Sequence, residues 1–535
     1  MSGEHSDRTY WSKSIGRRAI LRGGALGGIG LTGAALIGCS GGGITDAKPA
    51  STTAPAAASA AAVRRGGKLM LSDIPQTQDF HRHSGTMPSP SLVADTPTAI
   101  DGKGATQNFM LERLEAPDAS TYTLTFRPGI KFHNGREMTA EDVKKNIERI
   151  KATKGAWLKS IADITSNMTV SGANTITLKL SQPYSPMTAL ISELWLMAPE
   201  SPGWDSTITT PIATGPFMWK QWIPNDKIIL ERFPDYWRKG QPYVDTVEIK
   251  NLKGDTTPAL LAGDIHLATV GRDQRKLIQP NSGITFQQEK ATSWQFLSFN
   301  NRKPRAPYND IRVRQAIGYA LDKAALNELA NGDTGTVADQ MAAPKSFYWS
   351  DKIVDPFAKP DLAKAKQLLD AAGAKNLRPV VPVNTTPKEP EAVAAQLKQI
   401  GVTADLQVAD DITTETRLQA YEWDLYYAGS GTRSDIALRY VRMMSDGPNP
   451  GLWGGPQDAD YDRLVKEAWA SVDPEQRRQK YLDAWKVVTD KLFTIVVYHK
   501  ANTTGIRKEI GGWETGAVAN FARIDGGAAF AQLNG

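Results

Sequence analysis

Apolar and polar residues alternate along several short stretches in the first half of the chain, and this pattern predicts β-strands. The stretches are "KLMLSD" from Lys68, "YTLTF" from Tyr122, "NTITLKL" from Asn174, "DKIILERF" from Asp226, "DTVEIKNL" from Asp245 and "GDIHLATV" from Gly263. The first stretch places the start of the folded part of the chain near Gly67.

Other segments carry apolar residues three or four positions apart, which predicts amphipathic helices. In "TAEDVKKNIERI", Thr139 with Asp142 three positions later predicts a capped helix start. One long helix is expected from Asp310 through "DIRVRQAIGYALDKAALNEL". Three further helices are expected, in "DLAKAKQLLDAAG" from Asp361, "YDRLVKEAWA" from Tyr461 and "PEQRRQKYLDAWKVVTDKL" from Pro474.

Strand and helix patterns alternate later in the chain. "RPVVPVN", "EAVAAQLKQIG" and "VTADLQV", within residues 378–408, form a strand–helix–strand unit, which predicts a parallel sheet covered by helices. A chain of 535 residues exceeds what one hydrophobic core usually holds. The expected fold class is therefore α/β with more than one lobe.

The N-terminal segment has the features of an export signal. Arg17 and Arg18 precede a mildly apolar run that is weak for a membrane-spanning helix, and residues 1–38 resemble a twin-arginine signal. "LIGC" resembles a bacterial lipobox, which predicts lipid attachment at Cys39, the only cysteine. Residues 39–66, rich in Ser, Thr, Ala, Pro and Gly, are predicted to be a flexible tether. The expected location is extracytoplasmic, anchored to the outer face of the bacterial cytoplasmic membrane.

Charge and motifs exclude several classes of function. The net charge is +6, part of it in the leader, and no later basic tract fits nucleic acid. The chain has no nucleophile-elbow, P-loop or zinc-protease motif, and we expect no enzyme activity, cofactor or metal. His81 and His83 form a pair whose spacing is common by chance. Because two distant carboxylates leave no motif, an exported hydrolase remains the alternative.

The segment "YTLTFRPGIKFHNGREMTAEDVKKNIERI" closely resembles family 5 solute-binding proteins, the receptors of peptide and nickel ABC importers. The resemblance continues in order through "ATGPF", "ERFPDYWRKGQPYVDTVEIK", "FLSFNNRKPRAPYNDIRVRQAIGYALDKAAL" and "TIVVYHKAN". It implies a lipid-anchored, monomeric receptor that captures a peptide or similar small solute and delivers it to the permease subunits of an ABC importer. A receptor that serves a sensor instead is also open.

The resemblance also implies an architecture. We expect a two-lobed periplasmic-binding-protein-like fold of type II, with an extra subdomain and a hinge of two crossing segments. The expected boundaries are residues 67–293 for the first lobe, with the subdomain at about 98–184, residues 294–500 for the second lobe, and residues 501–535 for a return to the first.

The ligand-binding residues are predicted from the same resemblance. Peptide receptors of the family place an acidic residue after a Gly-Trp pair, where it holds the peptide amine; here Ser430 stands in place of the tryptophan. Arg433 near the acidic position favours a carboxylate or phosphate, whereas a short gap restores Asp435 as the amine partner, and both readings stay open. Four aromatic residues, each also compatible with simple packing, complete the predicted cleft: Trp294, Trp423, Tyr427 and Trp453.

Overall fold

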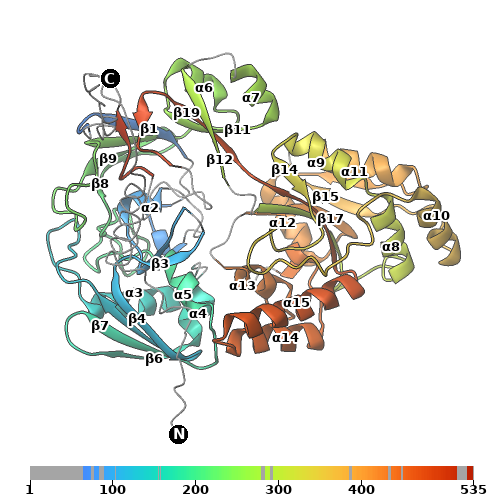
Figure 1. Cartoon of the computed structure of the whole chain (residues 1–535), viewed down its shortest axis with the longest axis horizontal. Helices are drawn as coiled ribbons and strands as arrows, with labels where there is room; N and C mark the ends of the chain where they lie inside the picture. Colours follow the sequence, from blue (N-terminus) through green and yellow to red (C-terminus); the bar gives the residue numbers. More distant parts are fainter. Residues whose placement is uncertain are drawn as a thin grey trace, which may run out of the picture. The chain divides into compact units, whose positions relative to one another are not determined.

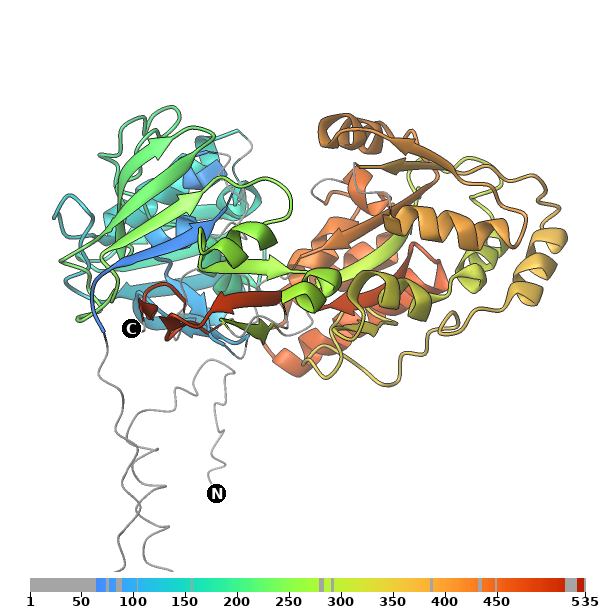
Figure 2. The same ribbon diagram turned by 90° about the horizontal axis from the view of Figure 1, so that it is seen from above.

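The computed structural model describes most of the chain from Arg64 onward (Figures 1 and 2). The described residues are 64–73, 77–82, 89–102, 104–154, 156, 158–278, 283–289, 293–384, 388–431, 435–447, 450–514 and 527–533. Four predicted functional residues lie outside them, namely Arg17, Arg18, Cys39 and Arg433, and so does His83. Within the described ranges no helix is both long enough and apolar enough to span a membrane.

The first strand, β1 (Lys68–Ser72), belongs to a four-stranded sheet with the order β1-β10-β9-β8. The other strands are β10 (Thr246–Lys250), β9 (Lys227–Arg232) and β8 (Phe217–Ile223). Alternation along β1 buries Leu69 and Leu71 completely. β1 runs parallel to β10, so this sheet joins segments that are far apart in the sequence.

A second four-stranded sheet has the order β4-β5-β7-β6 and is antiparallel throughout. Its strands are β4 (Leu111–Asp118), β5 (Thr121–Phe126), β7 (Thr175–Leu180) and β6 (Thr165–Val170). Helix α3 (Ala140–Ala152) packs against β6 and β7. Its predicted start is confirmed, because the Thr139 N–H donates to the Asp142 carboxylate at 2.8 Å in a capping box.

Short elements lie between these strands in the sequence or follow β19. They are η1 (Phe80–Arg82), α2 (Pro90–Val93), β2 (Thr98–Ile100), β3 (Thr106–Asn108), α4 (Lys159–Ile164), α5 (Met187–Leu190), η2 (Ile191–Glu193), β20 (Ile510–Gly511) and β21 (Gln532–Leu533). β2 pairs with β3, and β20 pairs with β21.

A three-stranded sheet has the order β11-β19-β12. It consists of β11 (Leu267–Val270), β19 (Thr503–Arg507) and β12 (Ile284–Gln288). In the sequence, α6 (Thr257–Ala262) precedes β11, and α7 (Arg272–Ile278) lies between β11 and β12. The central strand, β19, therefore comes from near the C-terminal end of the chain.

The fourth main sheet is antiparallel, with the order β14-β18-β13-β17. It consists of β14 (Gly335–Val337), β18 (Thr494–Lys500), β13 (Ser293–Phe299) and β17 (Leu425–Ser430). The two faces of β13 serve different cores: Trp294 and Phe296 pack on one side, and Leu297 and Phe299 on the other.

The predicted strand–helix–strand unit is confirmed. Strands β15 (Val380–Val383) and β16 (Asp405–Val408) pair in parallel and are joined through α11 (Lys388–Lys398). The neighbouring helices are α10 (Leu362–Ala371), α12 (Asp411–Ala420), α13 (Ala437–Tyr440), η3 (Val441–Met443), η4 (Pro450–Trp453), α14 (Ala459–Ala470) and α15 (Pro474–Asp490). Helices α14 and α15 lie side by side (Figure 1).

The single long helix expected from Asp310 is wrong. The segment forms two helices, α8 (Ile311–Ala320) and α9 (Lys323–Asn331), because the backbone becomes extended at Leu321. The Asp322 side chain then accepts a hydrogen bond from the Ala325 N–H at 2.9 Å and caps the second helix.

The chain passes twice between the β11-β19-β12 sheet and the β14-β18-β13-β17 sheet. One crossing leads from β12 to β13, and the other leads from β18 to β19, which pairs with β12 (Figure 2). Hydrogen bonds tie the crossings together: the Glu289 N–H donates to the Asn502 carbonyl at 2.9 Å, and the Ser293 hydroxyl donates to the Lys500 carbonyl at 3.0 Å.

Candidate ligand-binding site

Side chains from two distant parts of the sequence meet in one core cluster, which extends from Phe109 to Ala198 and from Trp294 to Val496. The Tyr184 ring packs edge-on against Trp469 with centroids 5.1 Å apart. The Ser185 N–H donates to the Trp469 carbonyl at 2.8 Å, and Arg477 Nη1 donates to the Ser185 hydroxyl at 3.2 Å. We call Tyr184, Ser185, Trp469 and Arg477 the junction.

Asp435 lies beside the junction and is only partly exposed. Burial raises the pKa of its carboxyl, while the charge of Arg477 and a hydrogen bond from the Ala437 N–H at 2.8 Å act in the opposite direction. Burial first, and then the Asp435 charge, raises the pKa of the Tyr184 and Tyr481 hydroxyls. An acidic group is therefore held where the two parts of the chain meet.

Two of the predicted aromatic residues lie together next to this region. The Trp294 and Trp453 rings have centroids 5.8 Å apart, and Phe296 stacks on Trp453 at 4.7 Å. The guanidinium of Arg439 lies 5.9 Å from the centroid of the Trp294 ring, and that of Arg442 lies 5.4 Å from Trp453. Arg439 belongs to α13, which begins two residues after Asp435, so α13 connects the aromatic pair with the carboxylate.

Trp423 and Tyr427 take other positions. The Trp423 indole N–H donates to the Leu418 carbonyl at 3.2 Å, and its ring packs edge-on against Tyr426. The Tyr427 hydroxyl donates to the Glu389 carboxylate at 3.2 Å, on the face of β17 that packs with Leu297 and Phe299. The structure thus brings Trp294 and Trp453 together, places Asp435 beside the junction, and places Trp423 and Tyr427 elsewhere.

Several residues of this region were not found from the sequence, namely Tyr184, Arg439, Arg477 and His499. For Arg477 a signal was present, because it shares helical spacing with the buried Tyr481, Ala484 and Val488 of α15. A charged residue on the buried face of an amphipathic helix needs a partner, but its identity depends on tertiary contacts.

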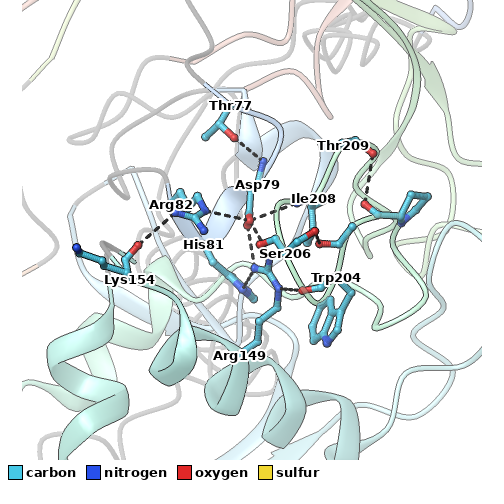
Figure 3. A network of polar contacts seen from close by, with 12 residues as sticks. Thr77, Asp79, His81, Arg82, Arg149, Lys154, Trp204, Ser206, Ile208 and Thr209 are labelled. Carbon is cyan, nitrogen blue, oxygen red and sulfur yellow. Dashed lines mark hydrogen bonds and ion pairs between the residues drawn. The ribbon is translucent and has the colours of Figure 1, made fainter.

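His81 belongs to a buried polar network elsewhere (Figure 3). Arg149 pairs with Asp79 through two hydrogen bonds, at 2.9 and 2.6 Å, and also contacts His81 Nδ1 at 2.9 Å. His81 Nε2 lies 3.0 Å from the Asn146 side-chain oxygen. Since both ring nitrogens are engaged within the protein, His81 serves structure here. Among the described residues no group of three or more His, Cys, Asp or Glu side chains is placed to hold a metal ion.

Comparison with protein families gives one match over most of the chain. The family described as "Bacterial extracellular solute-binding proteins, family 5 Middle" matches residues 107–451. Curated relatives include the glutathione-binding protein GsiB of Salmonella typhimurium, 27% identical over 430 residues, and that of Escherichia coli K12, 28% identical over 426 residues. Each alignment covers 72% of this chain and 80% of the relative.

Solved structures share the fold over nearly their whole length. DppA of Helicobacter pylori, solved in complex with a peptide, matches with a TM-score of 0.76 at 20% identity. The match covers 88% of this chain and 99% of the DppA chain. AppA of Bacillus subtilis, bound to a nonapeptide, has the same TM-score and identity, with 88% of this chain and 100% of its own covered. The expected two-lobed α/β fold is confirmed.

Proposed function

Since the chain belongs to the family 5 extracellular solute-binding proteins, we propose that it captures a peptide or similar small solute between its lobes and delivers it to an ABC importer. The observation that carries this proposal is the meeting of the junction, Asp435 and the Trp294–Trp453 pair beside two chain crossings. A solute held there contacts both parts of the chain at once, so its binding stabilises the closed arrangement.

We place the lobe boundaries as the sequence predicted them: residues 67–293 and 501–535 for the first lobe, and 294–500 for the second. The sheet memberships support this division. Strands β1, β8–β12 and β19 pair only with one another, and β13–β18 form sheets of their own. The crossings at Glu289–Ser293 and Lys500–Thr503 then serve as the hinge.

The proposed ligand site contains Trp294, Trp453, Asp435 and Arg433. Asp435 supplies a carboxylate for a ligand amine, because the partly buried group gains from an additional positive charge. Arg433, three residues after Ser430, supplies a guanidinium for a carboxylate. A peptide carries both charged groups. Trp423 and Tyr427 stay predictions from the sequence.

We further propose that residues 1–38 direct export and that Cys39 carries a lipid, which keeps the receptor next to its permease. The Arg17–Arg18 pair and the lipobox-like "LIGC" support this part of the proposal. Fractionation of cells that express Cys39→Ser tests the anchor: the variant is expected in the soluble fraction, and retention in the membrane fraction contradicts the anchor.

Binding without turnover distinguishes a receptor from the alternative hydrolase. The purified full chain is dialysed against a pool of di-, tri- and tetrapeptides that includes glutathione, and both compartments are analysed by mass spectrometry. We expect stoichiometric retention of unmodified peptides. Asp435→Asn removes the carboxylate that we propose holds the ligand amine. Glu422→Gln, which changes an exposed carboxylate, is its control. Release of cleaved products without retention contradicts the receptor function and favours the hydrolase.

A further inference from the structure

Polar contacts attach helix α7 to the C-terminal end of α9 and to the turn that follows it (Figure 1). Arg272 Nη2 lies 2.8 Å from the Glu328 carboxylate, and Arg272 Nη1 donates to the Glu328 carbonyl at 2.9 Å. Arg275 Nη2 lies 2.8 Å from the Asp333 carboxylate and donates to the Asn331 carbonyl at 3.4 Å. We call these five residues the strap.

The strap joins the two proposed lobes close to the chain crossings. Helix α7 precedes β12, from which one crossing leads to β13, and α9 precedes β14, which pairs with β18 at the other crossing. The Gln288 side chain at the end of β12 donates to the Thr334 carbonyl at 3.4 Å, next to the strap. All these contacts therefore span the boundary between residues 67–293 and residues 294–500.

The two arginines of the strap bring positive charge to a helix end. The last carbonyls of an α-helix have no partners within the helix and carry a partial negative charge. The last turn of α9 contains no basic residue of its own. The Glu328 and Asn331 carbonyls each accept an arginine N–H from α7 instead. One lobe thus supplies the cations that the helix end of the other lobe favours.

The exposure of the strap makes it sensitive to salt. The Glu328 and Asp333 side chains are 61% and 83% exposed. Ile278 of α7 is buried within the core of the β11-β19-β12 sheet, and Leu277 is 66% exposed, so neither apolar residue attaches α7 to α9. Exposed ion pairs are screened by salt and shift an equilibrium only a few-fold. Contacts of this strength bias the position of the lobes without locking it.

The strap and the junction occur in the same arrangement of the lobes. The junction joins Tyr184 and Ser185 of the first proposed lobe to Trp469 and Arg477 of the second. Because the lobes touch there, this arrangement is the closed one. Contacts that are made in the closed arrangement and lost when the lobes separate shift the equilibrium toward closure.

We propose that the strap biases the lobes toward closure, so that the ionic strength around the receptor sets the closed fraction and, through it, the affinity for the solute. This inference rests on the proposed receptor function and its lobe boundaries, and it adds a means of regulation. The apparent dissociation constant equals the intrinsic constant divided by the closed fraction. Salt that halves the closed fraction therefore doubles the apparent dissociation constant.

Distance measurements without ligand test the strap directly. Spin labels at Gln221→Cys and Lys366→Cys, one on each proposed lobe in a Cys39→Ser background, report the distance between the lobes at constant pH. Arg272→Gln combined with Arg275→Gln is expected to raise the population at longer distances about threefold or more at about 0.05 M salt. At about 0.5 M salt the parent should approach this variant, since the Debye length falls below about 5 Å.

A matched control and a charge exchange separate this role from general damage to α7. Lys276→Gln removes an exposed cation from the same helix and should leave the distances unchanged. Arg272→Glu places two carboxylates together and should open the lobes further. Adding Glu328→Arg should restore the parent distances, because the exchanged pair puts an acid at the start of α7 and a base at the end of α9.

Calorimetry with the tightest peptide from the dialysis pool tests the effect on binding. The dissociation constant of the Arg272→Gln, Arg275→Gln variant should rise by the factor by which its closed fraction falls. If this variant has the parent distances in low salt, or if the charge exchange does not restore them, the inference is wrong and the receptor function stands. If the parent binds no peptide, the receptor function fails, and the effect of the strap on affinity fails with it.

Discussion

Asp79, His81 and Arg149 show how single side chains in this protein are fixed by partners that are distant in the sequence. The Asp79 carboxylate is fully buried and is paired with the Arg149 guanidinium at 2.6 Å, and that guanidinium also contacts the imidazole (Figure 3). The "HRH" spacing alone left open whether the pair was incidental or a metal site. The structure gives His81 a hydrogen-bonding role that only the folded contacts reveal.

The neutral state of His81 predicts a loss of stability in acid. Burial, and then the Arg149 charge, lowers the pKa of His81 to about 4 from its ordinary value of 6.5. The folded state therefore binds fewer protons than the unfolded state, and stability present above pH 6.5 is lost as the pH falls toward 4. The contribution is about 3 kcal/mol.

Urea titrations at intervals from pH 7.5 to 4.5 measure this effect as the change in the free energy of unfolding. His81→Asn is expected to reduce the slope of the free energy of unfolding against pH. The reduction corresponds to at most one bound proton. His133 and His499, whose pKa values burial also lowers to about 4, keep their own contributions in that variant. An unchanged slope in His81→Asn contradicts the assignment.

At the same scale, the candidate ligand-binding residues stay predictions from the sequence. Trp294, Trp453 and Asp435 came from a resemblance to a family, since composition and spacing do not distinguish a cleft tryptophan from a packed one. Tyr427 shows the limit: its position on β17 was expected at the cleft, but the alternation of the strand turns it toward Glu389. His499 lacked any local signal, because its burial depends on the pairing of β18 with β13.

Among the elements, those with local signals were predicted best. The capping box at Thr139 fixed the start of α3, and the period-2 pattern found β1, β5, β7, β9, β10 and β11. The boundary between α8 and α9 was missed because the apolar spacing continues across it. A cap residue inside an unbroken helical pattern, Asp322, was the available signal.

The cap at Asp322 gives a prediction for this boundary. Asp322→Ala removes the acceptor of the Ala325 N–H and should lower the free energy of unfolding by about 1 kcal/mol. Asp322→Asn keeps an oxygen in the same place and serves as the matched control, with a change of less than about 0.5 kcal/mol. Equal stability of the alanine and asparagine variants in urea titrations contradicts a capping role.

In the whole molecule, the two chain crossings carry one buried acidic group. Glu289 is 8% exposed, and its carboxylate accepts a hydrogen bond from the Asn502 amide at 3.1 Å. Burial raises the pKa of Glu289 to about 7, although the hydrogen bond from Asn502 lowers it. Among the described residues no charged side chain contributes to this pKa shift.

This group predicts a pH-dependent hinge. Because the pKa is raised above the ordinary 4.5, ionisation as the pH rises through 7 disfavours the arrangement in which Glu289 is buried. Spin labels at Gln221→Cys and Lys366→Cys, in a Cys39→Ser background, report the distance between the lobes. We expect the distance distribution to shift between pH 6 and 8.

The shift should be absent in Glu289→Gln, whose side chain does not ionise, and present in Glu422→Gln, which changes an exposed acid. A distance distribution that is independent of pH in the protein with Glu289 intact contradicts this role for Glu289.

The resemblance to the family placed the crossings near Trp294 and residue 500. An acid at the hinge has no local sequence pattern, since its burial depends on the pairing of β12 with β19.

The position of β19 has a consequence for biosynthesis. Among the described residues, β11 and β12 do not pair with each other and are joined through β19, which follows β13–β18 in the sequence. The β11-β19-β12 sheet therefore completes its hydrogen bonding only after β13–β18 have been synthesised. An export route that translocates folded proteins suits such a chain better than a route that translocates the unfolded chain during its synthesis.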